Sequence, residues 1–104
     1  KITAVFQPHL YTRTRDFYKD FADSLSLLDE VILLDIYPAR ELPIEGVTSK
    51  LIYDNLRPEI EKSMCSKENL LEVIKHKKTD VLITLGAGDI ENYVPQIYEL
   101  LKDK

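Results

Sequence analysis

The chain has 104 residues, a length that supports one domain with a single hydrophobic core. Hydrophobic residues make up 44% and charged residues 31%, with three glycines and five prolines, which excludes collagen, low-complexity disorder and a disulfide scaffold. The formal net charge is −4, which disfavours nucleic acid and anionic membrane surfaces as partners.

The first elements along the chain are a strand, a helix and a second strand. An apolar strand is predicted over residues 2–6, and Gln7 and Pro8 end it because proline has no donor for a sheet. From Thr14 the apolar spacing becomes helical, with Thr12 or Thr14 as the expected cap. The helix face is formed by Phe17, Phe21, Leu25 and Leu28. Residues 31–35 then form an apolar run typical of a buried parallel strand.

The middle of the chain predicts shorter elements. A loop over residues 37–46 contains two prolines and a glycine, and Thr48 or Ser49 is expected to cap a short helix to about Leu56. Residues 63–65 have the character of a brief strand. Ser66 is then expected to cap a helix that ends in the cations of residues 76–78, at the negative pole of its dipole.

The last elements are a strand over residues 81–85, a glycine turn over 86–89 and a final helix. The helix presents Ile90, Val94, Ile97 and Leu101 on one face, and Pro95 is tolerated if it lies in the first turn. Alternating strands and helices predict the α/β class, with a mostly parallel sheet covered by helices.

The setting of the protein is suggested by its cysteine, its apolar runs and its first residues. Cys65 is the only cysteine, so it forms no internal disulfide, which fits a reducing, cytoplasmic compartment. The longest apolar run, residues 31–34, is too short to span a membrane, and no signal peptide pattern opens the chain. The chain enters a core strand directly after Lys1, so we expect it to be a piece of a longer protein.

The polar chemistry follows the strand ends, where parallel sheets bind their ligands. His9 and Arg13 follow the first strand near a helix N-terminus, where backbone N–H groups, an imidazole and a guanidinium would bind a carboxylate or phosphate. The alternative interpretation is an exposed His9, with Arg13 and Arg15 paired to Asp16 or Asp20 on the helix surface.

Two more loops add candidates. Tyr37, Arg40 and Glu41 follow the second strand, unless this is an ordinary surface loop stiffened by proline. Gly86, Ala87, Gly88 and Asp89 follow the last strand, where glycine lets the backbone approach a neighbour closely.

Several common sites lack their sequence signatures. The dinucleotide fingerprint lacks its third glycine, because position 91 is Glu. No P-loop and no G-x-S-x-G elbow occur. His9, Cys65 and His76 lack metal-ligand spacing, so no metal site is predicted, and Cys65 is interpreted as a small core residue.

Three segments together resemble the Mur ligases. Residues 6–16, FQPHLYTRTRD, resemble the family segment F-Q-P-H-R-Y-[ST]-R-T-R-D. Residues 37–49, YPARELPIEGVTS, resemble Y-[PA]-A-R-E-x-P-I-x-G-V-[TS]-S. Residues 86–90, GAGDI, match the family's G-A-G-D-I. The motifs occur in family order, and the likeness is to the branch that adds L-alanine to UDP-N-acetylmuramate.

The resemblance implies a Rossmann-like C-terminal domain, spanning residues 1–104, from which the first strand and helix of the domain are absent. It implies a reaction in which ATP phosphorylates the lactyl carboxylate and the alanine amine attacks the acyl phosphate. The missing N-terminal and central domains are expected to hold the UDP sugar, ATP and Mg²⁺, so the chain alone is expected to be inactive and to bind neither cofactor.

The resemblance also implies roles for individual residues. Arg13 and His9 match the family loop and are expected to bind the carboxylate of the amino acid or product, and no catalytic residue is assigned. Tyr37, Arg40, Gly86, Gly88 and Asp89 complete the predicted substrate-binding set. Leu10 stands where the family has arginine, so the chain retains one arginine of the pair or compensates from elsewhere.

Two other functions are weighed against this one. The first is a sister ligase that recycles murein tripeptide, although the loop around His9 and Arg13 favours the alanine enzyme. The second is a free-standing, non-catalytic α/β binding module. A receiver domain, its obvious form, needs clustered acids after the first strand, where this chain has Gln7, Pro8 and His9.

Overall fold

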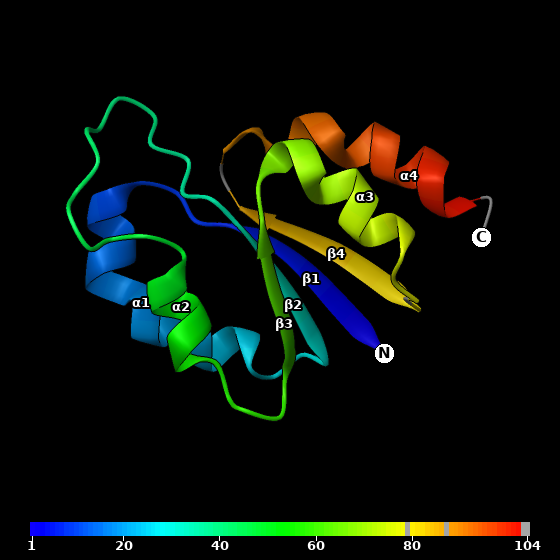
Figure 1. Ribbon diagram of the computed structural model, residues 1–104, viewed down its shortest axis with the longest axis horizontal. Coiled ribbons are helices and arrows are strands. Elements are labelled where there is room, and N and C mark those ends of the chain that lie inside the picture. Colours follow the sequence, from blue (N-terminus) through cyan, green and yellow to red (C-terminus); the bar gives the residue numbers. More distant parts are fainter. Residues whose placement is uncertain (79, 87, 103–104) are drawn as a thin grey trace.

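The computed structural model describes residues 1–78, 80–86 and 88–102, and they form a parallel sheet between two layers of helices (Figure 1). The strands are β1 (Ile2–Gln7), β2 (Glu30–Leu34), β3 (Glu61–Cys65) and β4 (Val81–Gly86). The α-helices are α1 (Tyr11–Leu25), α2 (Lys50–Asn55), α3 (Leu70–Lys75) and α4 (Val94–Lys102). Two 3₁₀ turns, η1 (Lys67–Asn69) and η2 (Asp89–Tyr93), precede α3 and α4.

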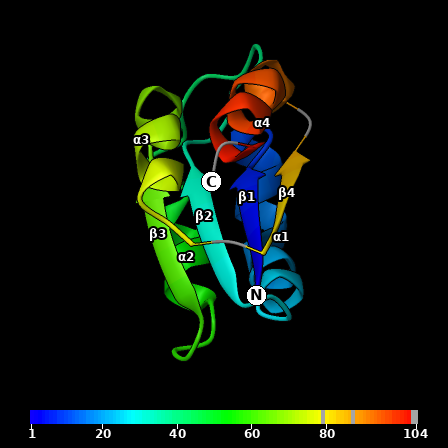
Figure 2. The ribbon, with the colours of Figure 1, turned by 90° about the vertical axis from the view of Figure 1, so that its right-hand side faces the viewer.

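The strand order is β3-β2-β1-β4, and every pairing in the described sheet is parallel. The chain winds outward from β1 to β3 and then crosses to the other side of β1. Helices α1 and α2 therefore lie on one face of the sheet, and α3 and α4 lie on the other (Figure 2). This arrangement confirms the predicted α/β class.

The core consists of two clusters, one on each face, because successive residues of a strand point to opposite sides. On the α3–α4 face, Val5, Ile32 and Leu34 pack with buried residues of the helices. On the α1–α2 face, Val31 and Leu33 pack with Ala22, Leu25, Ile52 and Leu56. Strand β2 is buried at all five positions, and it begins and ends one residue before the predicted run, because Glu30 belongs to it and Asp35 is exposed.

Helix α1 differs from its prediction at both its start and its face. It begins at Tyr11, and the cap position is Leu10, so the prediction of Thr12 or Thr14 as cap is wrong. Thr14 instead lies buried in the first turn, where its hydroxyl donates to the Leu10 carbonyl at 2.8 Å. The face turned to the sheet carries the small residue Ala22, which leaves Phe17 50% exposed at the side of the helix.

The shorter elements were predicted to within a few residues. Strand β3 begins at Glu61, two residues before the predicted strand. Helix α2 begins after Ser49, whose hydroxyl donates to the Leu34 carbonyl instead of capping the helix. The other predicted residue, Thr48, accepts a hydrogen bond from the Lys50 N–H with its hydroxyl at 3.2 Å. Ser66 makes no side-chain cap either, because η1 intervenes before α3. Pro95 lies in the first turn of α4, as predicted.

Candidate functional site

The loops after β1 and β4 meet at the carboxyl end of the sheet. Because β2 and β4 lie on opposite sides of β1, the chain leaves the ends of β1 and β4 in different directions, and such a point is where open α/β sheets form ligand crevices. A cavity of about 190 Å³, which we call the rim cavity, occurs there. It is lined by Phe6, Gln7, His9, Arg13, Phe21 and Gly86. The fold thus brings together three of the predicted site residues, His9, Arg13 and Gly86.

The loop after β2 is joined to the loop after β1 by backbone hydrogen bonds. The Leu10 N–H donates to the Tyr37 carbonyl, and the Tyr37 N–H donates to the Pro8 carbonyl, each at 2.8 Å. The His9 and Tyr37 rings stack, with centroids 5.8 Å apart and planes 15° from parallel. Leu10 has φ +70°, a conformation that costs a branched side chain about 1–3 kcal/mol. Tyr37 therefore lies beside the rim cavity and orients the imidazole of His9.

The N-terminus of α1 is closed by a carboxylate from 30 residues away. Oε1 of Glu41 accepts hydrogen bonds from the Tyr11 N–H at 2.6 Å and from the Thr12 N–H at 3.1 Å. Oε2 accepts from the Thr12 hydroxyl at 2.5 Å, and this bond lowers the pKa of Glu41 below its ordinary value. The expectation that these helix N–H groups are available to a ligand is therefore wrong, because Glu41 occupies two of them.

Asp89 makes hydrogen bonds and an ion pair within the protein, and it does not line the rim cavity. Its Oδ1 accepts from Nε2 of the buried Gln7 at 2.6 Å, while Oε1 of Gln7 accepts from the Ile90 N–H at 2.9 Å. Asp89 also pairs with Lys67, and these contacts, led by Lys67, lower the pKa of the Asp89 carboxyl. Asp89 thus ties the turn after β4 to the end of β1.

The two glycines of this turn pack so closely against neighbouring residues of the protein that a side chain would not fit. A Cβ at Gly86 would lie 2.7 Å from the Gln7 carbonyl oxygen, and Gly86 has φ +144°. A Cβ at Gly88 would lie 2.5 Å from Gln7 Oε1 and 2.7 Å from Tyr37 Cγ. The close approach that the sequence indicated is therefore to Gln7 and Tyr37. Ala87, in the same motif, lies outside the described residues.

The arginines of the two loops have different environments. Arg15 pairs with Asp16 at 2.9 Å, as the surface interpretation proposed. Arg13 is exposed and has no ion-pair partner within the described part of the chain, so its guanidinium is open to a ligand. Arg40 is also exposed, and the fold does not bring it into the lining of the rim cavity.

Comparison with known proteins identifies relatives across the full length of the chain. It is 80% identical over all 104 residues to a UDP-N-acetylmuramate–L-alanine ligase from Phocaeicola vulgatus. Proteins of the same name from Parabacteroides distasonis and Cytophaga hutchinsonii are 56% and 51% identical over 97% and 100% of the chain. The chain is homologous to these ligases over 97% or more of its length. It spans only 22–23% of the length of these relatives. No protein-family model matches it.

The homology confirms the resemblance that the three motifs indicated. Each of these relatives carries the name of the alanine ligase rather than that of a recycling ligase or a binding module. The three motif loops are also the loops that meet around the rim cavity, which lies at the end of β1.

Two structural residues of the site were not foreseen in their roles. Gln7 was interpreted only as the end of a strand, yet its buried amide joins β1 to η2. Glu41 was placed among loop candidates, and its capping role depends on a contact between loops 30 residues apart. The one available signal was the absence of a capping side chain at Leu10, which leaves helix N–H groups needing an acceptor.

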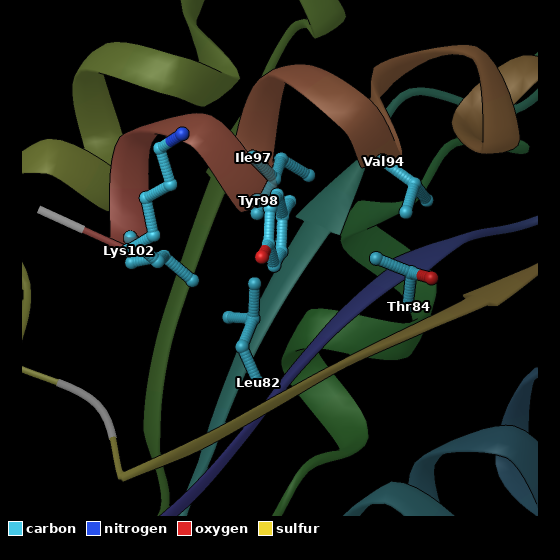
Figure 3. A pocket seen from close by; sticks show the side chains of 7 residues that line it. Leu82, Thr84, Val94, Ile97, Tyr98 and Lys102 are labelled. Atoms are coloured by element: carbon cyan, nitrogen blue, oxygen red, sulfur yellow. The ribbon is translucent and has the colours of Figure 1, made fainter.

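Two larger cavities share no lining residue with the rim cavity. One, of about 380 Å³, lies between β4 and α4, where Leu82 and Thr84 face Val94, Ile97 and Tyr98 (Figure 3). Its lining is mainly apolar, which does not suit an anionic substrate. The other, of about 310 Å³, is lined by Tyr11, Asp35, Ile36, Val47, Thr48 and Ser49.

Neither a cluster of metal ligands nor a membrane-spanning helix occurs in the described residues. In residues 1–78, 80–86 and 88–102, no three His, Cys, Asp or Glu side chains gather in a way that could hold a metal ion. No helix in this part of the chain has both the length and the apolar character needed to cross a bilayer.

Proposed function

We propose that the chain is the C-terminal domain of an ATP-dependent ligase that joins L-alanine to UDP-N-acetylmuramate in peptidoglycan precursor synthesis in the cytoplasm. The proposal is supported by relatives of that name, 51–80% identical, of which the chain spans 22–23%. The resemblance of three segments to motifs near the C-terminal end of such enzymes also supports it. The domain is proposed to extend beyond these residues, with a further strand and helix ahead of β1.

The observation that carries the proposal is the position of Arg13 in the rim cavity beside His9. The guanidinium is a permanent cation with donors that match both oxygens of a carboxylate. Arg13 has no ion-pair partner in the described residues, so a substrate carboxylate would not have to displace an internal one. We infer that it binds the carboxylate of L-alanine or of the new product, with His9 beside it.

The proposed reaction explains why a cation is needed at this place. The γ-phosphoryl group of ATP is transferred to a carboxylate oxygen of UDP-N-acetylmuramate, and ADP leaves. The alanine amine then attacks the acyl carbon, the amide bond forms, and phosphate leaves with the former carboxylate oxygen. Arg13 would hold the alanine carboxylate so that the amine faces the acyl carbon, which is a positioning contribution.

The residues present do not form a site for ATP or for Mg²⁺. The sequence has no P-loop, and the described residues hold no cluster of metal ligands. ATP and Mg²⁺, together with the UDP sugar, would therefore be bound by the rest of the ligase.

Replacement of Arg13 tests the proposal in the full-length ligase. We expect Arg13→Ala to lower kcat/KM for L-alanine by about 100-fold or more, because a charge-assisted contact to the substrate is lost. Arg15→Ala is the matched control, since Arg15 lies on the same helix but pairs with Asp16. Steady-state assays of amide formation measure both. Normal alanine turnover in Arg13→Ala would remove Arg13 from the mechanism.

A further inference from the structure

We propose that Glu41 is a positioning residue of the rim cavity, because it holds the first turn of α1 and thereby sets the direction of Arg13. This inference rests on the proposed function for the role of Arg13. Glu41 does not line the rim cavity, so its proposed effect on the reaction is indirect.

The Glu41 carboxylate contacts the first turn of α1 with both of its oxygens. Both carboxylate oxygens are used, on two N–H groups and one hydroxyl of Tyr11 and Thr12, at 2.5–3.1 Å. Arg13 follows these two residues directly in the same helical turn. A change in the geometry of this turn therefore moves the origin of the Arg13 side chain.

Glu41 is itself held in place by its own loop. Its N–H donates to the Pro38 carbonyl at 2.8 Å across a turn in which Ala39 has φ +52°. The preceding residue of that turn, Tyr37, exchanges backbone hydrogen bonds with Pro8 and Leu10. The two loops are thus joined both at the Tyr37 backbone and at the Glu41 carboxylate.

The helix has no capping side chain of its own, because Leu10 occupies the cap position with a positive φ. Glu41 supplies the acceptor that Leu10 cannot supply. Since an internal carboxylate already occupies the helix N-terminus, a substrate carboxylate is left to the side chain of Arg13. The internal carboxylate therefore also determines which group of this loop recognises the substrate.

The test uses the full-length ligase with Glu41→Ala and Glu41→Gln. We expect Glu41→Ala to raise the KM for L-alanine about 10- to 100-fold and to leave the KM for ATP unchanged, because a small displacement of a positioned group is costly. Glu41→Gln keeps one oxygen acceptor, so we expect an intermediate KM. Hydrogen exchange of the first α1 turn should accelerate in the same order. Glu45→Ala, an exposed carboxylate of the same loop, is the matched control.

A double mutant separates positioning from a general effect on folding. If Glu41 acts through Arg13, Glu41→Ala should cause no further loss in an Arg13→Ala background. A full additional loss in that background would overturn the inference. If Glu41→Ala keeps the parental KM for L-alanine while Arg13→Ala is impaired, the inference about Glu41 is overturned and the proposed function is not. Normal turnover in Arg13→Ala would instead contradict the proposed function.

Discussion

The two ends of the sheet differ in whether their charged side chains are paired within the protein. At the carboxyl end, Arg13 is exposed and has no ion-pair partner among the described residues, and His9 is half-buried beside it. At the amino end, Glu30, the first residue of β2, has a completely buried side chain between two lysines. One end holds a cation open to an anion, and the other holds an anion that the protein neutralises by itself.

The Glu30 cluster shows what an internally balanced charge requires. Lys77 Nζ lies 2.6 Å and Lys1 Nζ 3.5 Å from its carboxylate oxygens, and the Thr3 hydroxyl donates at 3.2 Å. Burial alone would raise the pKa of Glu30, but these partners, led by Lys77, hold that pKa below its ordinary value. A buried ion pair with partners on each oxygen adds little net stability, but removing one member is costly.

The difference indicates a division of labour along the strands. At the amino end, Glu30 pairs with Lys1 and Lys77 at the start of β2, and the Lys1 amino group pairs with Asp80 just before β4 at 2.9 Å. At the opposite end, internal carboxylates such as Glu41 and Asp89 satisfy the backbone and the amide of Gln7, and Arg13 is left for a substrate. The contrast predicts that substitutions at the amino end affect stability, whereas those at the carboxyl end affect activity as well.

The largest expected effect on stability is at Glu30. Glu30→Ala should lower the free energy of unfolding by about 2–4 kcal/mol, because Lys77 then faces a buried site without its carboxylate. The loss is at the lower part of the range for buried pairs, since the Lys77 side chain is 27% exposed and can turn toward water. Urea unfolding measures it. A loss below about 0.5 kcal/mol would show that the charge pair at the amino end contributes little to the free energy of unfolding.

A smaller effect is expected at Gly88, where the carboxyl end depends on steric fit. Gly88→Ala should cost about 1–3 kcal/mol, because the new Cβ meets Gln7 and Tyr37. It should also lower ligase activity, since Tyr37 stacks on His9. Gly46→Ala is the matched control: at φ +80° it is strained by about 1 kcal/mol, but its Cβ meets no atom within 4 Å. Equal loss of activity in both variants would show that the contacts of Gly88 with Gln7 and Tyr37 are not the cause.

The smallest effect is the pH dependence of stability. Because the folded pKa of Glu30 lies below its ordinary value, its stabilising contribution is complete above about pH 4.3 and is lost as the pH falls through the folded pKa. Glu30→Gln cannot ionise, so the stability difference between parent and variant should narrow as the pH falls below about 4. Urea midpoints measured over this range provide the test, and parallel profiles would refute a titrating Glu30.

The fold could be predicted from the sequence because its central strands are defined by local burial. The apolar runs of β1, β2 and β4 indicated strands within one or two residues of their bounds. Strand β3 was harder, since it lies at the edge of the described sheet and its five residues are half-buried or exposed. The face of α1 was assigned only in part, because small residues, not Phe17, set how the helix lies on the sheet.

By itself, the sequence determined the α/β class, the three motif loops and the likeness to the Mur ligases, since each depends on residues near one another in the chain. Only the tertiary structure decided which groups stay available. Arg13 remains open to a ligand, while Glu41 and Asp89 are engaged by residues 22 to 82 positions away. Such pairings depend on which strands become neighbours, because the spacing of residues within one segment does not indicate a partner that lies on another loop.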